Sequence, residues 1–237
     1  MGLLLFDIDG TMIRPLGLGR RAFESALRIT YGRLPEGEPF PYDGLLDPQI
    51  ARRTLEAMDI EPTHDEIGLI LAAYVDCLGK RPPPDAGAIL CPGFPGLLEE
   101  AAARRHSIAL LTGNIRQGAE AKLTLAGLAG HFRPGGPGSG LLGAFGDDAE
   151  ERPGLVPIAM ERCTRELGMT FTHEETWIVG DSPRDVEAAQ TAGVRCAAVA
   201  TGLTGLDALQ SMGPDVVLAD LSDPAPFWDA LEAGGDR

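Results

Sequence analysis

The chain has 237 residues, of which 20 are basic and 35 acidic, so its formal net charge at pH 7 is −15. This acidic balance argues against nucleic acid and against an anionic membrane surface as binding partners. Hydrophobic residues make up 44% of the chain, which is enough for a sizeable core and excludes a disordered chain or a small disulfide-stapled scaffold.

Four cysteines stand at positions 77, 91, 163 and 196, with no C-x-x-C pair and no histidine at zinc-ligand spacing. This pattern is typical of reduced cytosolic thiols. The first residues carry no basic start and reach Asp7 too early for a signal peptide, and no apolar run is long enough to span a membrane. We therefore expect a cytoplasmic protein, either a monomer or a homodimer.

Five short apolar runs alternate with helical segments. They are Leu3 to Phe6, Ile108 to Leu111, Trp177 to Val179, Cys196 to Ala200 and Val216 to Ala219. This alternation predicts an α/β fold with a Rossmann-like parallel sheet and helices on both faces. Residues 133 to 143 are rich in Gly and Pro and predict an exposed loop, followed by a possible short strand at Leu141 to Phe145.

The connection from the first run to the second is far too long for one crossover helix. Only Pro92 to Arg105 is needed for that crossover, so residues 15–88 are predicted to fold separately. Residues 1–14 and 89–237 would then form the α/β core. We expect the insert to lie over the carboxyl ends of the strands.

Apolar spacing within the insert predicts helices, so the insert is interpreted as an all-helical cap domain. Asp47 is the predicted N-cap of one helix, with Pro48 in its first turn. Thr63 begins a second with a capping box, and Gly79 ends it. The run Pro82-Pro83-Pro84 predicts a stiff return linker.

Asp7-Ile8-Asp9-Gly10-Thr11 leads directly from the first strand into a glycine turn. Residues two apart in an extended chain point the same way, so Asp7 and Asp9 could both face the ligand-binding edge of the sheet. Two carboxylates this close repel unless a cation or a shared proton relieves them. The pattern suits Mg²⁺, although Asp-x-Asp-Gly alone would more often be a simple turn.

A second acidic motif, Gly180-Asp181-Ser182-Pro183-Arg184-Asp185, follows another strand. Ser182 can cap the next helix with Pro183 in its first turn, which places Asp185 four residues from Asp181. Both carboxylates are therefore candidate metal ligands. The alternative for Asp185 is that it only complements the helix dipole.

A third strand ends in Leu111-Thr112-Gly113-Asn114, where a hydroxyl and backbone N–H groups meet a helix start. Such a junction can cradle a phosphate. Taken alone, Thr112 is equally well explained as a helix cap.

With D-x-D-G-T, the Thr-ended strand and G-D-x-x-x-D in this order around an inserted cap, the chain resembles the haloacid dehalogenase (HAD) superfamily over essentially its whole length. The similarity is greatest to the phosphoglycolate-phosphatase-like branch with a helical cap. The resemblance implies that Asp7 is the phosphate-accepting nucleophile and Asp9 the general acid and base. It also implies a Mg²⁺ ion at the Asp7 carboxylate, the Asp9 carbonyl and Asp181, supported by Asp185, with Gly10, Thr112, Gly113 and Asn114 around the phosphate.

One position departs from the family pattern. The superfamily supplies a lysine shortly before its last acidic motif, but the only lysine of the predicted core, Lys122, is on a different helix. Arg152 stands at the matching place, before Pro153, and would keep the charge with a different geometry. We therefore interpret Arg152 as catalytic and phosphate-binding, the alternative being a surface arginine that balances its acidic neighbours.

The preferred function is a Mg²⁺-dependent phosphatase, a phosphoric monoester hydrolase, acting on a small phosphorylated metabolite such as phosphoglycolate through an aspartyl-phosphate. Arg20, Arg21 and the turn Asp43 to Asp47 are candidates for substrate contacts from the cap. The alternatives are a phosphomutase on the same scaffold and a non-catalytic or regulatory phosphate-binding relative.

Overall fold

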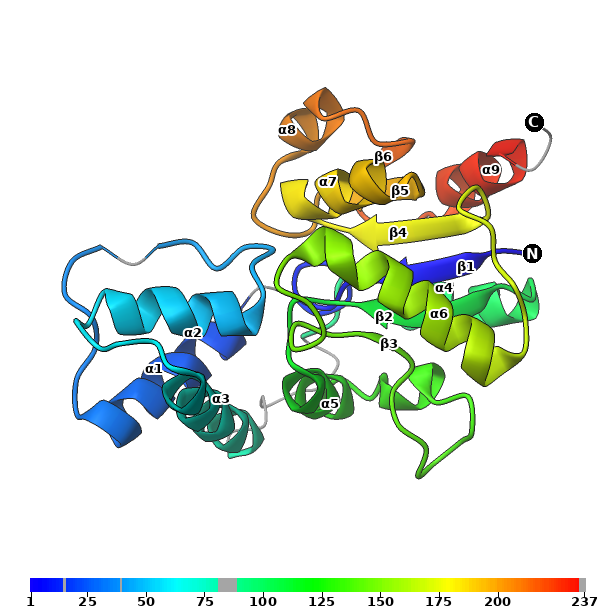
Figure 1. The fold of residues 1–237 in the computed structure, drawn as a ribbon. Helices are drawn as coiled ribbons and strands as arrows, with labels where there is room; N and C mark the ends of the chain where they lie inside the picture. The colour runs from blue at the N-terminus through cyan, green and yellow to red at the C-terminus, as the bar shows by residue number, and fades with distance from the viewer. Residues whose placement is uncertain (15, 39, 81–88, 235–237) are drawn as a thin grey trace.

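The computed structural model describes residues 1–14, 16–38, 40–80 and 89–234, with a parallel six-stranded sheet at its centre (Figure 1). The strand order is β3-β2-β1-β4-β5-β6, and every neighbouring pair is parallel. The strands are β1 (Leu3–Phe6), β2 (Ser107–Leu111), β3 (Gly143–Ala144), β4 (Thr176–Gly180), β5 (Arg195–Val199) and β6 (Val216–Leu218). The predicted α/β fold is confirmed, with the five main strands shifted by at most a residue at either end and the possible strand near residue 143 reduced to two residues.

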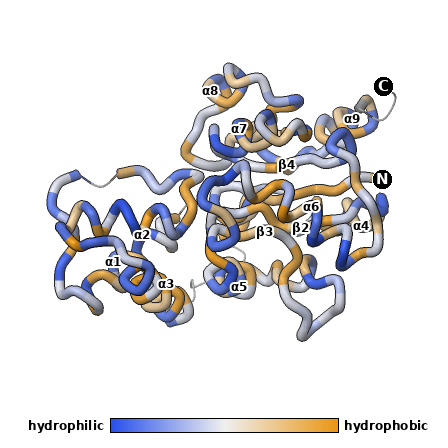
Figure 2. Tube along the Cα trace, viewed as in Figure 1, coloured by the Kyte–Doolittle hydropathy of each residue, from blue (hydrophilic) through white to orange (hydrophobic). Residues whose placement is uncertain are grey.

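Helices cover both faces of the sheet because the strands are apolar on both sides. The core helices are α4 (Gly96–Ala103), α5 (Arg116–Leu125), α6 (Leu155–Leu167), α7 (Pro183–Ala192), α8 (Leu206–Ser211) and α9 (Ala225–Gly234). Leu4 and Phe6 pack with residues of α4, α5 and α9 on one face, whereas Leu3 and Leu5 pack with α6, α7 and α8 on the other. Figure 2 shows hydrophobic residues concentrated along the central strands.

Three helices precede α4 and form the cap, α1 (Leu18–Tyr31), α2 (Asp47–Glu56) and α3 (His64–Gly79). They lie to one side of the sheet in Figure 1 and bury a hydrophobic cluster of their own that includes Phe23, Leu27, Ile70 and Tyr74. The predicted helix end at Gly79 is confirmed. The proline run at 82–84, predicted as a linker, lies outside the described residues.

The cap is seated on the core through the segment from Asp43 to Gln49. The Asp47 backbone N–H donates to the Gly113 carbonyl over 2.7 Å, and the Gln49 side chain donates to the Glu150 carbonyl over 2.8 Å. Arg184 donates in turn to the Asp43 carbonyl over 2.9 Å. The cap therefore contacts the same loops that end the strands.

The prediction that Asp47 caps its own helix is wrong. Leu46 occupies the N-cap position of α2, and the Asp47 carboxylate instead accepts the backbone N–H of Ile115 over 2.9 Å. Ile115 is the residue before α5, where the first N–H groups of a helix need acceptors from outside it. A side chain of the cap domain therefore accepts a backbone N–H at the start of a helix of the core.

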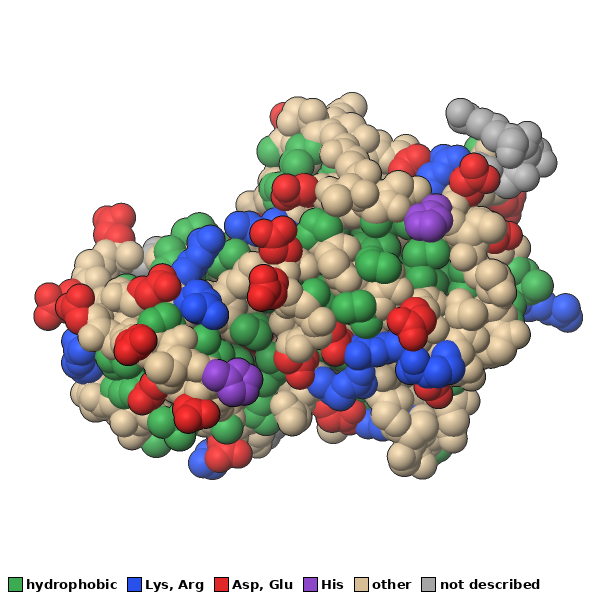
Figure 3. Space-filling view, viewed as in Figure 1, with side chains coloured by type: hydrophobic (Ala, Val, Ile, Leu, Met, Phe, Trp, Pro, Cys, Tyr) green, Lys and Arg blue, Asp and Glu red, His purple; other side chains and the backbone are tan. Residues whose placement is uncertain are grey.

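Acidic and basic side chains are interspersed over the face of the molecule seen in Figure 3. In the described part of the chain, no helix combines the length and the apolar character needed to cross a membrane.

Candidate active site

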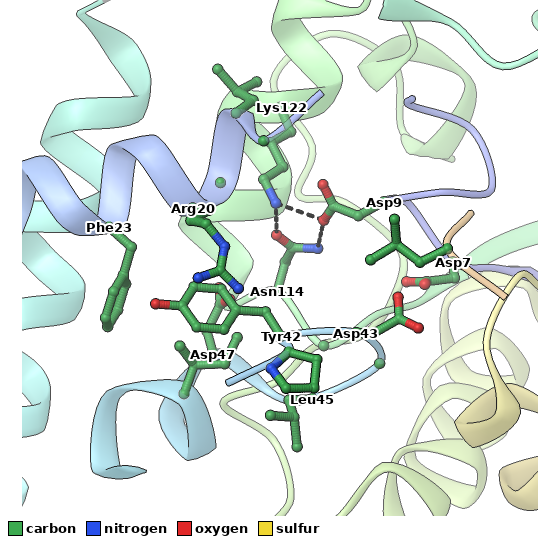
Figure 4. A pocket seen from close by; sticks show the side chains of 18 of the residues that line it. Asp7, Asp9, Arg20, Phe23, Tyr42, Asp43, Leu45, Asp47, Asn114 and Lys122 are labelled. Atoms are coloured by element: carbon green, nitrogen blue, oxygen red, sulfur yellow. Dashed lines mark hydrogen bonds and ion pairs between the residues drawn. The ribbon is translucent and has the colours of Figure 1, made fainter. Parts of the chain in front are cut away.

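A cavity of about 250 Å³ lies between the cap and the carboxyl ends of the strands (Figure 4). The core contributes charged and polar residues to its wall, namely Asp7, Asp9, Arg14, Asn114, Lys122, Arg152 and Asp181. The cap contributes Arg20, Phe23, Tyr42, Asp43, Asp47 and Tyr74. The cavity is where the sequence predicts the chemistry, because ligands of open parallel sheets bind beyond the carboxyl ends of the strands.

Three acidic side chains come together at the core side of the cavity. Asp7, Asp181 and Asp185 are all buried, and each offers an oxygen atom such that the three atoms lie within 4.8 Å of one another. Burial, together with the nearby Asp185 and Asp9 charges, raises the pKa of Asp7 to about 6, against the lowering effect of Arg152. Burial and the neighbouring Asp7 and Asp185 charges also raise the pKa of Asp181. A cation at this position would relieve the repulsion.

The donor set fits a hard, oxygen-binding cation. Asp181 Oδ1 accepts a hydrogen bond from the Thr11 hydroxyl over 2.9 Å, and a Cβ atom at Gly10 or Gly202 would collide with its Oδ2. Glycine at both positions therefore leaves room for this oxygen. Carboxylate oxygens without cysteine or histidine are the ligands that Mg²⁺ prefers.

Asp185 is held by four hydrogen bonds and differs in this respect from the other two acids. Its Oδ1 accepts Nε and Nη2 of Arg152 over 3.0 and 2.5 Å. Its Oδ2 accepts the Ser182 backbone N–H over 3.0 Å and the Ser182 hydroxyl over 2.7 Å. With both oxygens engaged, Asp185 suits the supporting role, and Asp7 and Asp181 are better placed as direct ligands.

Arg152 lies in the short turn Arg152–Gly154 before α6 and is only 4% exposed. Its Nη2 is 3.1 Å from Asp7 Oδ2 and 2.5 Å from Asp185 Oδ1. The interpretation as a surface arginine is therefore wrong, because the guanidinium lies inside the molecule between two acidic motifs. This position brings a fixed positive charge to the predicted nucleophile.

Asp9 lines the cavity, but its carboxylate turns away from the three buried acids. Its Oδ2 accepts hydrogen bonds from Asn114 Nδ2 over 2.8 Å and from Lys122 Nζ over 2.6 Å. Lys122 Nζ also donates to Asn114 Oδ1 over 2.6 Å, which closes a ring of three side chains (Figure 4). Any contact of Asp9 with a metal would therefore involve its carbonyl, as the family resemblance implies.

The sequence does not predict the place of Lys122 in the site, because this lysine lies on a different helix from the position where the family has one. Helical side chains lean toward the N-terminus of their helix, and on α5 that end faces the cavity. A long side chain one and a half turns into the helix can therefore reach back to the strand ends. The usable signal was its spacing of eight residues from Asn114, which places both near the same edge of the sheet.

The predicted phosphate cradle is only partly directed at the cavity. Thr112 is fully buried, and its Oγ1 accepts the backbone N–H of Asn114 over 3.3 Å and the Asn114 Nδ2 over 2.8 Å. It does not line the cavity, whereas Gly113 and Asn114 do. Gly113 also lies so close to the cap that a Cβ atom there would collide with the Leu45 carbonyl.

Gly10 serves the geometry of the turn after β1. Its φ of 87° is a left-handed conformation that favours glycine, and its carbonyl accepts the Thr201 hydroxyl over 2.5 Å. It does not line the cavity. Its contact with Asp181 therefore links the first and last acidic motifs.

The cap wall of the cavity carries a cation and two acids. The Arg20 guanidinium lies 4.1 Å above the centre of the Tyr42 ring and donates to the Phe40 carbonyl over 2.9 Å. Asp43 and Asp47 line the same wall, and burial raises the pKa of Asp47 to about 7. Arg21, the other candidate arginine, is exposed and does not line the cavity.

Comparison with known proteins gives a consistent family. Residues 153–224 match the family model described as HAD-hydrolase-like. The phosphoglycolate phosphatase 1 of Pseudomonas aeruginosa is 26% identical over 96% of this chain and 79% of its own length. The pyrophosphatase PpaX of Oceanobacillus iheyensis is 29% identical over 93% of each chain.

A solved structure shows the same fold. The β-phosphoglucomutase of Clostridium difficile superposes with a TM-score of 0.71 over 100% of both chains, at 12% sequence identity. The predicted resemblance is thus confirmed over the fold and most of the sequence. On this evidence, the chain is an enzyme that is similar to the HAD-like hydrolases.

Proposed function

We propose that this protein is a Mg²⁺-dependent phosphatase that hydrolyses a small phosphate monoester, with phosphoglycolate as the preferred candidate. The observation that carries the proposal is the position of Asp7, which lies at the end of β1 between the Arg152 guanidinium and the Asp181 carboxylate and lines the cavity. The names of the two sequence relatives, one a phosphoglycolate phosphatase, support the same reaction class.

In the proposed reaction, an Asp7 oxygen attacks phosphorus as the bond from phosphorus to the leaving oxygen breaks. Asp9 gives its proton to that oxygen and releases an alcohol. A water molecule then attacks the phosphorus of the aspartyl-phosphate, Asp9 takes a proton from the water, and phosphate leaves as Asp7 is regenerated. Arg152, 3.1 Å from Asp7, is placed to hold the negative charge of the phosphoryl oxygens.

Mg²⁺, held by Asp7 and Asp181 with Asp185 in support, would screen the repulsion between the nucleophile and the phosphate and stabilise the charge that develops during transfer. The chain's own part is to hold these oxygens in place. Arg152 and Ser182 fix Asp185, and Thr11 fixes Asp181.

The first test of the proposal is phosphate release from a panel of phosphate monoesters and pyrophosphate, measured with Mg²⁺ and with excess EDTA. We expect release from at least one small monoester with Mg²⁺, and none in EDTA. Full activity in EDTA would contradict the metal requirement. Transfer of the phosphoryl group to a phosphorylated sugar added as acceptor, with no release of phosphate in its absence, would favour a phosphomutase. No turnover of any monoester would favour a phosphate-binding relative.

The finer proposal of an acidic substrate rests on Arg20. The cavity accommodates a phosphoryl group and a small organic part, and Arg20 is the cation on its cap wall that pairs with a π face and a carbonyl instead of an acid. It can therefore bind a substrate carboxylate without first breaking a salt bridge. A hydrogen bond to a charged group contributes about 1.5 to 3 kcal/mol.

We therefore expect Arg20→Ala to lower kcat/KM for phosphoglycolate about 10- to 100-fold, mostly through KM. The activity with p-nitrophenyl phosphate, which has no carboxylate, should change little. The matched control is Arg21→Ala, which removes the neighbouring but exposed arginine and should leave both activities unchanged. An equal loss of kcat/KM with both substrates would show that Arg20 supports the structure of the cap and does not bind the substrate carboxylate.

A further inference from the structure

We infer that Lys122 is a positioning residue for Asp9, which it holds so that Oδ2 is fixed and Oδ1 is the oxygen that transfers the proton. This inference rests on the proposed phosphatase function. It concerns a residue of α5 that lies outside the three strand-end motifs, whereas Arg152 lies in the turn before α6.

The hydrogen bonds of the ring determine the orientation of each member. Lys122 can only donate, so the oxygen of the Asn114 amide faces Lys122 and its Nδ2 faces Asp9. Asp9 Oδ2 then accepts two hydrogen bonds, of 2.8 and 2.6 Å. Among the described residues, none donates to Asp9 Oδ1 within hydrogen-bond distance.

This arrangement gives the two carboxylate oxygens of Asp9 different roles. A proton on Oδ2 would face the Lys122 ammonium, which has no acceptor to offer it. The proton of the acid form therefore belongs on Oδ1, the oxygen left for the reacting groups. When the bond from phosphorus to the leaving oxygen breaks, this O–H bond breaks and the proton forms the O–H of the alcohol, while the Asp9 charge that remains is stabilised by Lys122.

The surroundings of Lys122 hold its side chain in this position. The side chain is 4% exposed, and Gly19 of α1 leaves room for its ammonium group, while Gly118 of α5 lies against Tyr74. A Cβ atom at Gly19 of α1 would lie 3.2 Å from Lys122 Nζ and 3.6 Å from the Tyr74 hydroxyl oxygen. One at Gly118, a turn before Lys122 on α5, would lie 3.4 Å from the Tyr74 ring.

The cap therefore closes over the ammonium group. Burial lowers the pKa of the Lys122 ammonium, but the Asp9 charge, with Tyr74 of α3 and Asp47 beside it, raises this pKa well above its usual value. With water excluded, a charge-assisted hydrogen bond is stronger than at the surface. Lys122 thus couples the seated cap to the orientation of the general acid.

The test compares two substrates that differ in their need for a proton. Glycolate leaves phosphoglycolate as an alkoxide unless its bridging oxygen is protonated, whereas p-nitrophenolate leaves p-nitrophenyl phosphate readily without a proton. We expect Lys122→Met to slow the phosphorylation of Asp7 by phosphoglycolate, measured by rapid quench, about 100-fold or more. The same step with p-nitrophenyl phosphate, measured as the burst of nitrophenolate, should slow less than about 10-fold.

The chain contains one other lysine, Lys80, which is exposed at the end of α3, so Lys80→Met is the matched control and should leave both rates unchanged. A second variant, Lys122→Ala, allows rescue with ethylammonium, which can donate hydrogen bonds to Asp9. Tetramethylammonium carries the same charge without an N–H donor and should not restore the rate. If Lys122→Met does not fold, the rescue of Lys122→Ala is sufficient to test the inference.

An equal loss with both substrates, or rescue by both ammonium ions, would overturn the positioning role. So would wild-type rates in Lys122→Met. These outcomes differ from a failure of the proposed function, in which the wild-type protein releases phosphate from neither substrate.

Discussion

Asp7→Asn should abolish turnover of every phosphate monoester while leaving the fold intact, because an amide oxygen is too weak a nucleophile to attack phosphorus. The wild-type protein should also bind beryllium fluoride as an analogue of the phosphorylated aspartate, and Asp7→Asn should not. The measurements are phosphate release over long incubations and ¹⁹F NMR of the fluoride complex. Residual turnover of a few per cent, in protein free of wild-type contamination, would contradict a covalent intermediate on Asp7.

The thermal stability of the same variant separates a chemical effect from an unfolding effect. Folding raises the pKa of Asp7 from 3.8 to about 6, chiefly through burial. The folded protein therefore holds this proton more tightly than the unfolded chain, and the metal-free wild type loses stability as the pH rises from about 4 to about 6. Asp7→Asn removes the buried charge, so its Tm in EDTA at pH 7 should be no lower than that of the wild type.

Arg152→Ala should lower kcat/KM about 100-fold or more, the size typical of removing one preorganised charge from a transition state. The guanidinium contacts Asp7 over 3.1 Å and cannot be replaced by water without moving the phosphoryl group it would hold. Arg152→Lys should recover part of the activity, because an ammonium keeps the charge but loses the two-pronged contact with Asp185.

Stability must be measured alongside, because Arg152→Ala leaves the buried Asp185 carboxylate without its cationic partner. Breaking a buried ion pair in this way costs about 3 to 5 kcal/mol. Thermal unfolding of both variants identifies the temperature range in which activity reflects folded protein. Arg152→Lys, which keeps the ion pair, should lose less stability than Arg152→Ala. Wild-type kcat/KM in folded Arg152→Ala would mean that another group, or none, neutralises the phosphate.

Local sequence determined most of the fold. The strands were predictable because each is a short apolar run bounded by turn residues, and burial on both faces requires apolar side chains at every position of β1. The insert was predictable because the chain between the first two strands is too long for one crossover. The acidic motifs were predictable as a group because the carboxyl ends of parallel strands lie at one edge of a sheet.

Tertiary structure decided which partner each side chain takes. Asp47 has the sequence of a cap for its own helix, but its carboxylate binds Ile115, 68 positions away. Lys122 pairs with Asp9 across 113 positions, and Arg152 with Asp185 across 33. Secondary-structure propensity and motif spacing describe neighbours within a few residues along the chain. These contacts instead depend on how the cap packs on the core and on which charged side chains are buried away from water. The sequence by itself therefore determined the scaffold, the acidic motifs and Arg152 as a candidate cation, and only the folded structure determined that Lys122 pairs with Asp9 and Arg152 with Asp185.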